Sequence, residues 1–488
     1  MTTLQLERAD LLCQDNFIDG QWTAAISGAR FDVRDPADQS LVAAVPDSAE
    51  DDALTAVAAA SRAYADWRWT SARERADLLK RWHALILAHE TDLGRLISRE
   101  QGKPLAEAIG EVRYAASYVE WFAEAAAHVT GDLIAAPDRK RRMLAQKEPV
   151  GVVAVVTPWN FPAAMIARKI APALAAGCTV VGKPAEDTPL TALALARLAE
   201  QAGLPAGVLN LVCASRARTP AVVDAWLDDA RVRKISFTGS TAVGKHLAAR
   251  AAPTLKKLSL ELGGNAPFIV FDDADLDAAV DGLVAAKFRN AGQTCISPNR
   301  VLVQQGVYAE FADRLSRRVA ALKVGPAHED GVQIGPLINA RAADKVERHI
   351  ADALAQGARL LTGGARGPGN FVHPAVLIDV AQPMLVCNEE TFGPVLSLAP
   401  FATEDEALEQ ANATPFGLAG YFYTQDAARI WRFGDRLECG VLGVNEGLIS
   451  AAAAPFGGVK ESGYGREGSI HGLDDYLQLK YVCQGGLA

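Results

Sequence analysis

The sequence predicts a doubly wound α/β protein, and three observations support this prediction. Short apolar runs alternate with longer stretches whose apolar residues recur every three to four positions, which is the order of strands and helices in a parallel sheet. The segment VGVVAVVTPWNFP, residues 150–162, is a continuous apolar run closed by prolines, as expected for a strand buried on both faces. The chain has 488 residues, enough for roughly two to four domains.

The first part of the chain is expected to be helical, and the segment after it is expected to alternate. Residues 51–130 carry apolar and charged side chains at helical spacing, as in RADLLKRWHALILAHETDLGRLIS. The elements expected between residues 150 and 262 are a strand at its start, a helix near 163–176, the strands CTVVGKP, GVLNLV, RKISFTG and KKLSLEL, and the helices TALALARLAEQAG and TAVGKHLAARAA.

A second α/β unit is predicted from Ala266, at APFIVFDDADLDAAVDGLVAAKFRN, to about residue 440. Two glycine-rich segments, LTGGARGPGN at 361–370 and APFGGVKESGYGREGS at 454–469, interrupt or follow this unit. We expect them to be loops at the surface or at the active site, and not flexible linkers.

Composition argues against several classes of function. With 58 acidic and 49 basic side chains the formal charge is −9, and no long Lys/Arg run occurs, so no nucleic acid or membrane partner is expected. No apolar run approaches the roughly 18 residues that span a bilayer, and the start lacks a secretory pattern. The seven cysteines form no CxxC pair, so neither a disulfide framework nor a metal site is expected. These features favour small-molecule chemistry in the reducing cytoplasm.

A glycine loop, ISFTGSTAVGKH at 235–246, places Gly239 and Gly244 between a strand and a helix, where backbone N–H groups can hold a phosphate. A P-loop would need Ser or Thr after GxxxxGK, but His246 stands there, which disfavours a nucleotide hydrolase. No GxGxxG fingerprint is present either. That the glycines only form a tight turn stays open at this point.

Cys295 lies in FRNAGQTCISPNR, among small and polar neighbours that follow a predicted helix. A thiol in such a loop can be reached by substrate and act as a nucleophile. A buried structural cysteine is the alternative, and the local sequence does not decide between the two.

Five segments in this order decide it: PWNFP, FTGS, ELGG, GQTC and EETFGP. With them the chain resembles the aldehyde dehydrogenase superfamily from about residue 15 to its C-terminus. The resemblance implies two Rossmann-like doubly wound domains and a small β oligomerisation segment. It places the NAD-binding domain at 1–127 and 150–261, the catalytic domain at 262–455, and the oligomerisation segment of a dimer or tetramer at 128–149 and 470–488.

The resemblance also implies the catalytic roles. Cys295 attacks the aldehyde carbon and forms a thiohemiacetal, while the side-chain amide of Asn160 and the N–H of Cys295 bind the oxyanion. Glu261 is the general base. Lys169 and Glu467 resemble a supporting proton-relay pair. A catalytically dead relative is disfavoured because all these groups are present, and a CoA-acylating relative is disfavoured by Glu261.

The cofactor positions implied by the resemblance are Lys183 and Glu186 at the adenosine ribose, Trp159, Gly239 and Ser240 near the pyrophosphate, and Glu390 and Phe392 at the nicotinamide ribose. The carboxylate of Glu186 accepts hydrogen bonds from ribose hydroxyls and repels a 2′-phosphate. NAD is therefore expected over NADP, although the nearby Lys183 can relax this preference.

Two arginines near the catalytic loops, Arg168 and Arg289, suggest a substrate that carries an acid, because guanidinium groups pair with carboxylates. Either could instead be a solvated helix residue. The strings FPAAMIARK, KFRNAGQTC, GLIS and GLDDYLQLKYVCQGG resemble succinate-semialdehyde dehydrogenases. That subfamily places both arginines and Ser450 at the substrate carboxylate, with Phe456 as apolar wall.

The expected reaction is NAD-dependent oxidation of succinate semialdehyde to succinate. Glutarate semialdehyde stays open as an alternative, because one methylene is worth only roughly 1–3 kcal/mol of discrimination. One position departs from the subfamily: Ser297 stands where several members carry a second cysteine, so an inactivating disulfide in this loop is not expected.

Overall fold

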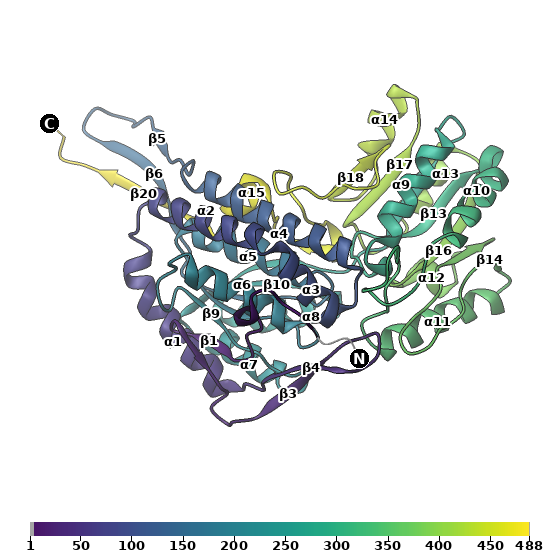
Figure 1. The fold of residues 1–488 in the computed structure, drawn as a ribbon. Coiled ribbons are helices and arrows are strands. Elements are labelled where there is room, and N and C mark those ends of the chain that lie inside the picture. The colour runs from purple at the N-terminus through teal and green to yellow at the C-terminus, as the bar shows by residue number, and fades with distance from the viewer. Residues whose placement is uncertain (1–3, 488) are drawn as a thin grey trace.

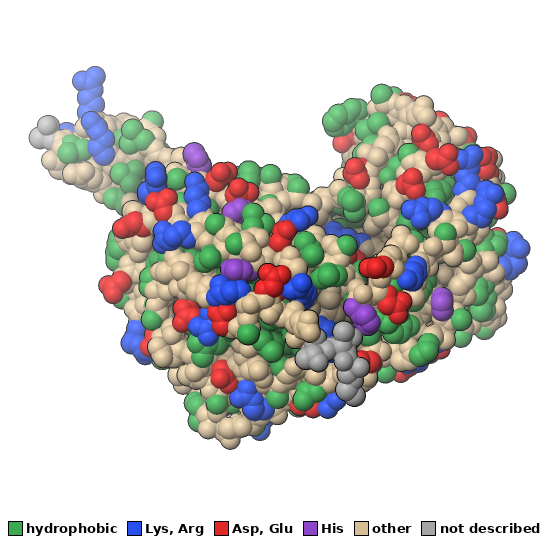
Figure 2. Space-filling model, viewed as in Figure 1, with side chains coloured by type: hydrophobic (Ala, Val, Ile, Leu, Met, Phe, Trp, Pro, Cys, Tyr) green, Lys and Arg blue, Asp and Glu red, His purple; other side chains and the backbone are tan. Residues whose placement is uncertain are grey.

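Two large β-sheets, each covered by helices on both faces, make up most of the structure (Figure 1). The computed structural model describes residues 4–487. The surface between the two α/β units is hollowed in the view of Figure 2. The predicted fold class, an α/β protein with two doubly wound units, is confirmed.

The first sheet contains eight strands, which are in spatial order β19 (Gly463–Tyr464), β11 (Lys257–Glu261), β10 (Val232–Thr238), β7 (Val152–Val156), β8 (Thr179–Lys183), β9 (Leu209–Leu211), β1 (Asn16–Ile18) and β2 (Gln21–Thr23). The five from β11 to β9 are parallel. The remaining three pair antiparallel at the two edges.

Eight helices cover this sheet. On one face lie α2 (Ala72–Ala88), α3 (Glu90–Gln101), α4 (Leu105–Ala126), α5 (Pro162–Ala176) and α6 (Pro189–Gln201), and on the other α1 (Glu50–Trp67), α7 (Thr219–Asp228) and α8 (Thr241–Ala251).

β7 shows why its sequence is apolar at every position. Val153 and Val155 belong to the core under α2, α4 and α5, whereas Val152, Ala154 and Val156 belong to the core under α1 and α7. A strand between two helical layers must be apolar on both faces.

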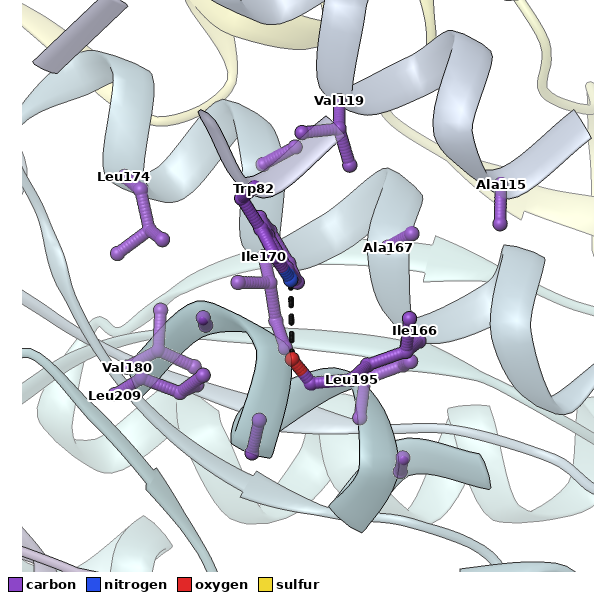
Figure 3. Packing of buried hydrophobic residues seen from close by; sticks show 14 of the residues in the cluster. Trp82, Ala115, Val119, Ile166, Ala167, Ile170, Leu174, Val180, Leu195 and Leu209 are labelled. Atoms are coloured by element: carbon purple, nitrogen blue, oxygen red, sulfur yellow. Dashed lines mark hydrogen bonds between the residues drawn. The ribbon is translucent and has the colours of Figure 1, made fainter. Parts of the chain in front are cut away.

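The core on the α5 face is centred on one tryptophan (Figure 3). Trp82 of α2 is buried among Val119 of α4 and Ile166 and Ile170 of α5. Its indole N–H donates to the carbonyl of Leu195 at 3.0 Å, so burial leaves no unsatisfied donor there. This packing fixes α5, the helix that follows the PWNFP segment.

The second sheet has the order β14 (Arg359–Thr362), β15 (Ala375–Ile378), β16 (Val395–Phe401), β13 (Pro298–Gln304), β12 (Ala266–Val270), β17 (Ala419–Tyr423) and β18 (Val441–Val444). All pairs are parallel except that of β14. The helices are α9 (Leu276–Phe288), α10 (Tyr308–Ala320), α11 (Ala340–Ala355) and α12 (Leu385–Asn388) on one face, with α13 (Glu404–Asn412) and α14 (Ala427–Gly434) on the other.

A separate antiparallel sheet projects from the body as an arm (Figure 1). Its strands are β5 (Asp132–Ile134), β6 (Arg142–Pro149) and β20 (Leu477–Gln484), which fall in the segments predicted for oligomerisation. Two smaller features complete the fold, the hairpin of β3 (Arg30–Arg34) with β4 (Leu41–Pro46), and α15 (Ser469–Asp474). No helix among residues 4–487 is long and apolar enough to cross a membrane.

Candidate active site

The cysteine loop has an unusual backbone. Three consecutive residues shortly before Cys295 adopt left-handed conformations: Asn290, Ala291 and Gly292, with φ of 52°, 54° and 77°. Such conformations are unfavourable for residues other than glycine. At Gly292 a Cβ atom would lie 2.3 Å from the carbonyl oxygen of Gly393, so only glycine fits there. The loop is therefore held in place by close contacts with its surroundings.

Cys295 is half-buried and lines a small cavity. Burial raises the pKa of this thiol to about 12, and the nearby Arg168 acts in the opposite direction. The resting group is a thiol that needs a base to become a nucleophile. The residues around it include Phe161, Arg168, Arg289, Thr294, Ser450 and Phe456.

Asn160 lies between β7 and α5 and contacts the cysteine loop directly. Its side-chain amide donates to the carbonyl of Gln293 at 3.0 Å. Its own carbonyl accepts from Lys103 Nζ at 3.0 Å and from the side-chain amide of Asn290 at 2.7 Å. The fold thus places an amide donor beside the loop that carries the thiol.

Glu261 is the last residue of β11 and is 2% exposed. Neither of its carboxylate oxygens has a hydrogen-bond partner among the described residues. Burial, followed by the charge of Glu467, raises the pKa of Glu261 well above its usual value. The ELGG glycines bring this strand end close to the backbone of Cys295, because a Cβ atom on Gly264 would lie 2.3 Å from the carbonyl oxygen of Cys295. When it is deprotonated, this carboxylate has two unpaired oxygens available as proton acceptors near the cysteine.

Glu467 forms a buried cluster with two neighbouring cations of α5. Its carboxylate pairs with both Arg168 and Lys169, and all three side chains are less than 5% exposed. Lys169 also reaches Ser236 Oγ at 3.3 Å. The sequence suggested separate roles for the two cations, but the structure joins them on one carboxylate. This arises because Glu467 lies in the segment that pairs with Phe456 beside the cavity.

Arg289 differs from Arg168 in its surroundings. The guanidinium lies 4.6 Å from the ring centroid of Phe161 and 5.6 Å from that of Tyr114. Among residues 4–487 it forms no ion pair, and it lines the cavity that contains Cys295. The rings hold the cation in place, so its charged edge remains available to an anion.

A wider cavity of about 510 Å³ shares Tyr114, Arg289 and Ser450 with the cavity at Cys295. Its other walls come from α4 and α9, from Leu448, and from the segments at Leu322 and at Gln333 and Ile334. The two spaces therefore lie on either side of the same three side chains. Tyr114 was not found by sequence analysis, since no motif marks it within its helix.

On the opposite side, the predicted cofactor residues gather at the carboxyl ends of the first sheet. Lys183 ends β8, and its Nζ lies 3.0 Å from Glu186 Oε2. Burial raises the pKa of Glu186, but the charge of Lys183, hydrogen bonds and the charge of Arg216 together outweigh it, so the net pKa is lowered and the carboxylate is ionised at neutral pH. Dinucleotides bind at this edge of open α/β sheets.

The glycine loop begins α8. The hydroxyl of Ser240 accepts from the backbone N–H of Val243 at 3.4 Å and caps the helix. A Cβ atom on Gly239 would lie 2.3 Å from the ring of Phe237. A side chain at position 239 would therefore collide with this ring, and the first-turn N–H groups of α8 that Ser240 does not cap suit a phosphate.

The EETFGP segment, residues 389–394, contacts both the catalytic segments and the predicted cofactor residues. Glu390 accepts from the backbone N–H of Gly264 at 3.1 Å, and burial raises its pKa to about 7. Phe392 has a left-handed backbone, with φ of 54°, and its ring meets that of Trp159 edge to face at 5.5 Å. These groups and the strand ends fit a dinucleotide.

Helix α11 holds the EETFGP segment through basic residues that sequence analysis missed. Lys345 donates to the carbonyl of Glu390 at 2.5 Å, and His349 bridges Thr391 at 3.2 Å and Glu389 at 3.1 Å. No local signal marks them, because their partners are about 40 residues away in the chain. Residues 4–487 contain no cluster of His, Cys, Asp and Glu suited to a metal ion.

Comparison with known proteins agrees with this geometry. A sequence model described as the aldehyde dehydrogenase family matches residues 22–482. The 3-sulfolactaldehyde dehydrogenase of Pseudomonas putida is 53% identical over 99% of this chain and 99% of its own. The NADP(+) succinate-semialdehyde dehydrogenase of Escherichia coli (strain K12) is 52% identical over 99% of this chain and 100% of its own. The crystal structure of succinate-semialdehyde dehydrogenase from Burkholderia pseudomallei has a TM-score of 0.97 and 53% identity, covering 99% of this chain and 100% of that chain.

These matches extend over nearly the whole chain, whereas the resemblance inferred from sequence rested on five short segments. Membership of one family therefore explains both the five segments and the fold around them. The chain belongs to the aldehyde dehydrogenase family and is an NAD(P)-dependent oxidoreductase that oxidises an aldehyde.

Proposed function

We propose that the substrate is a short aldehyde with an anion at its far end, and that succinate semialdehyde is oxidised to succinate. The observation that supports this most directly is the guanidinium of Arg289, which lines the cysteine cavity without an ion-pair partner among the described residues. A half-buried free cation favours an anionic ligand and disfavours a neutral one. Ser450 and Arg168 line the same cavity and complete the site for the anion.

In the proposed mechanism, the sulfur of Cys295 bonds to the aldehyde carbon after its proton leaves to Glu261. The amide of Asn160 and the N–H of Cys295 donate to the resulting oxyanion. When bound, NAD would supply the acceptor for the hydride that leaves the former aldehyde carbon, so that a thioester to Cys295 would remain. Glu261 then takes a proton from the water that attacks the thioester, and the acid leaves as the Cys295 sulfur is restored. Lys169 and Glu467 pass protons onward from Glu261.

The proposed cofactor is NAD, with NADP used less well. The ionised Glu186 next to Lys183 supports this, because its carboxylate accepts hydrogen bonds from ribose hydroxyls and repels a 2′-phosphate. Trp159, Gly239 and Ser240 are proposed at the pyrophosphate. Glu390 and Phe392 are proposed at the nicotinamide ribose.

A second candidate substrate is 3-sulfolactaldehyde, because the Pseudomonas putida enzyme named for it is 53% identical. Its sulfonate is also an anion that a guanidinium can bind, so the same cavity suits it. Glutarate semialdehyde, one methylene longer than the main candidate, is the third.

A substrate panel tests the proposal. NADH formation is followed with succinate, glutarate and malonate semialdehydes, 3-sulfolactaldehyde and butanal, and kcat/KM is compared. We expect the highest value with succinate semialdehyde and the lowest with butanal. A higher value with the sulfonate would favour the second candidate, and equal values with butanal would overturn the anionic class altogether.

We also propose the predicted division of the chain, with the cofactor domain at 1–127 and 150–261, the catalytic domain at 262–455, and 128–149 with 470–488 in an oligomer interface. The arm supports the last part, because Leu133, Leu479 and Tyr481 are 81%, 68% and 56% exposed. Exposed apolar side chains on a projecting sheet favour association with another copy. Sedimentation of the purified protein would distinguish a dimer or tetramer from a monomer.

A further inference from the structure

Lys103, in the turn between α3 and α4, is only 2% exposed, although lysine is almost never fully buried. Its amino group lies 2.5 Å from Glu111 Oε2 and 3.0 Å from the carbonyl oxygen of Asn160. It also lies 3.8 Å from the ring centroid of Phe161. The amino group therefore contacts both Asn160 and Phe161 of the PWNFP segment. Lys103 itself lies outside the five segments on which the family resemblance rests.

The partner of Lys103 holds the start of α5. The second carboxylate oxygen of Glu111 accepts from the backbone N–H groups of Ala163 at 2.8 Å and Ala164 at 3.3 Å. These N–H groups belong to the first turn of the helix and have no acceptor within the helix, so a carboxylate placed there is favourable. The ion pair thus fixes the chain on both sides of Phe161, at the Asn160 carbonyl and at the first turn of the helix.

The same turn also orients the second donor to the Asn160 carbonyl. That donor is the side-chain amide of Asn290, whose oxygen accepts from Gln101 Nε2 at 2.8 Å. Gln101 in turn accepts from the backbone N–H of Lys103 at 3.1 Å. Two side chains oriented by one turn therefore meet on a single main-chain oxygen.

We propose that Lys103 is a positioning residue for the oxyanion site: by holding the main-chain carbonyl of Asn160, it sets the direction of the Asn160 side-chain amide relative to Cys295. This inference rests on the proposed function, in which that amide binds the substrate oxygen. Lys103 touches no substrate and acts only through Asn160.

The expected effect follows from the geometry that such sites require. Loss of an oxyanion donor lowers kcat by roughly 100- to 1000-fold, and supporting groups must hold such donors within about 0.5 Å. A donor that is displaced but still present should lose less. We therefore expect removal of the Lys103 contact to lower kcat roughly 10- to 100-fold.

Two variants isolate that contact. Glu111→Gln removes the carboxylate charge, keeps an oxygen for the α5 amides and keeps Lys103 as a donor to Asn160. Lys103→Met in the Glu111→Gln background then removes the donor without leaving Glu111 as a buried, unpaired carboxylate; Glu107, whose pKa Lys103 also lowers, keeps Arg289 and the backbone N–H of Asn290. The kcat ratio between these two proteins reports the contact itself.

A matched control is Lys256→Met. Lys256 is also buried and donates to two main-chain carbonyls, of Asp229 and Val232, both at 2.8 Å. These carbonyls belong to the opposite end of the sheet from Glu261. This variant should keep the kcat of the unmodified enzyme even where its melting temperature falls.

The readouts separate positioning from general disorder. The KM for NAD and the alkylation rate of Cys295 by iodoacetamide are measured beside kcat, and kcat is expressed per alkylatable Cys295. With this normalisation, an unfolded fraction of the preparation does not lower the calculated kcat. We expect the double variant to lose kcat while its alkylation rate and NAD KM stay within about twofold of those of Glu111→Gln.

Two results would overturn the inference: a double variant as fast as Glu111→Gln, or an alkylation rate that falls in step with kcat. Asn160→Ala separates this failure from failure of the proposed function. If Asn160→Ala keeps its kcat, the oxyanion role of Asn160 is wrong, and the inference falls with it. If Asn160→Ala is slow and the double variant is not, only the role of Lys103 is wrong.

Discussion

Replacing Arg289 by glutamine tests how the cavity recognises a charged substrate. Glutamine keeps a polar side chain but removes the charge and the planar fork that pairs with a carboxylate. Arg289 has no ion pair among residues 4–487, and its contacts are with the rings of Phe161 and Tyr114. The substitution breaks no ion pair among the described residues, although it removes a charge that lowers the pKa of Glu107, and its main effect should be on substrate binding.

The magnitude follows from the placement of the guanidinium. A hydrogen bond to a charged group contributes about 1.5–3 kcal/mol, and a fork offers two. Because Arg289 is half-buried, water weakens each contact, and we take about 2–3 kcal/mol for the pair. At about 1.4 kcal/mol for each factor of ten, kcat/KM for succinate semialdehyde should fall roughly 30- to 150-fold.

The loss should appear in KM more than in kcat, because the far carboxylate has the same charge in the ground state and in the transition state. The assay is NADH formation with succinate semialdehyde and with butanal, each over a range of concentrations. Butanal has no far anion, so its kcat/KM should change little. Arg317→Gln, at a 70% exposed arginine on α10, is the control for removal of a charge elsewhere.

Two outcomes would refute this reasoning. Equal losses for both aldehydes would mean that Arg289 shapes the cavity and does not bind the anion. Unchanged kinetics for both would mean that the anion binds elsewhere or that the substrate carries none.

Three further predictions concern the base, the cofactor and the thiol. Since burial raises the pKa of Glu261 and a base works only when deprotonated, kcat should rise with pH on an acidic limb that Glu261→Gln abolishes; an identical pH profile for the variant would exclude the base role. Glu186→Ser should raise the NADP/NAD ratio of kcat/KM roughly tenfold, as expected when a repulsion of about 1.4 kcal/mol is removed, and an unchanged ratio would reject the assignment. Peroxide should inactivate the enzyme by oxidising Cys295 itself, because Ser297 offers no second thiol; peptide mapping that finds Cys295 in an intrachain disulfide would contradict this.

The parallel centre of each sheet could be predicted because burial on both faces leaves a local mark. β7 is apolar at every position since its alternate residues enter two different cores. The strands between residues 16 and 46 left no such mark. β1 has three residues and exists by pairing with β2 and, at Phe17, with Leu211 of β9. Its stability depends on a partner about 200 positions away, which no local pattern can show.

The same distinction applies to the site. Cys295, Asn160 and Glu261 stand in short segments whose glycines and prolines shape the local backbone, so those segments are recognisable in the sequence. Lys103 and His349 act through side-chain contacts with residues 57 and about 40 positions away. Nothing in their own neighbourhoods distinguishes them from surface residues of a helical region.

The pairing of Arg168 with Glu467 indicates that Arg168 and Arg289 have different roles. Arg168 favours the ionised forms of both Cys295 and Glu261, lowering the pKa of each against the effect of burial. A substrate anion bound to Arg168 alone would compete with Glu467 and weaken that effect. An anion held mainly by Arg289 leaves the Arg168–Glu467 pair intact, so recognition of the substrate tail need not disturb the charges that prepare the thiol. The free guanidinium of Arg289 is therefore the better primary anchor, with Arg168 as the cation that the catalytic groups also require.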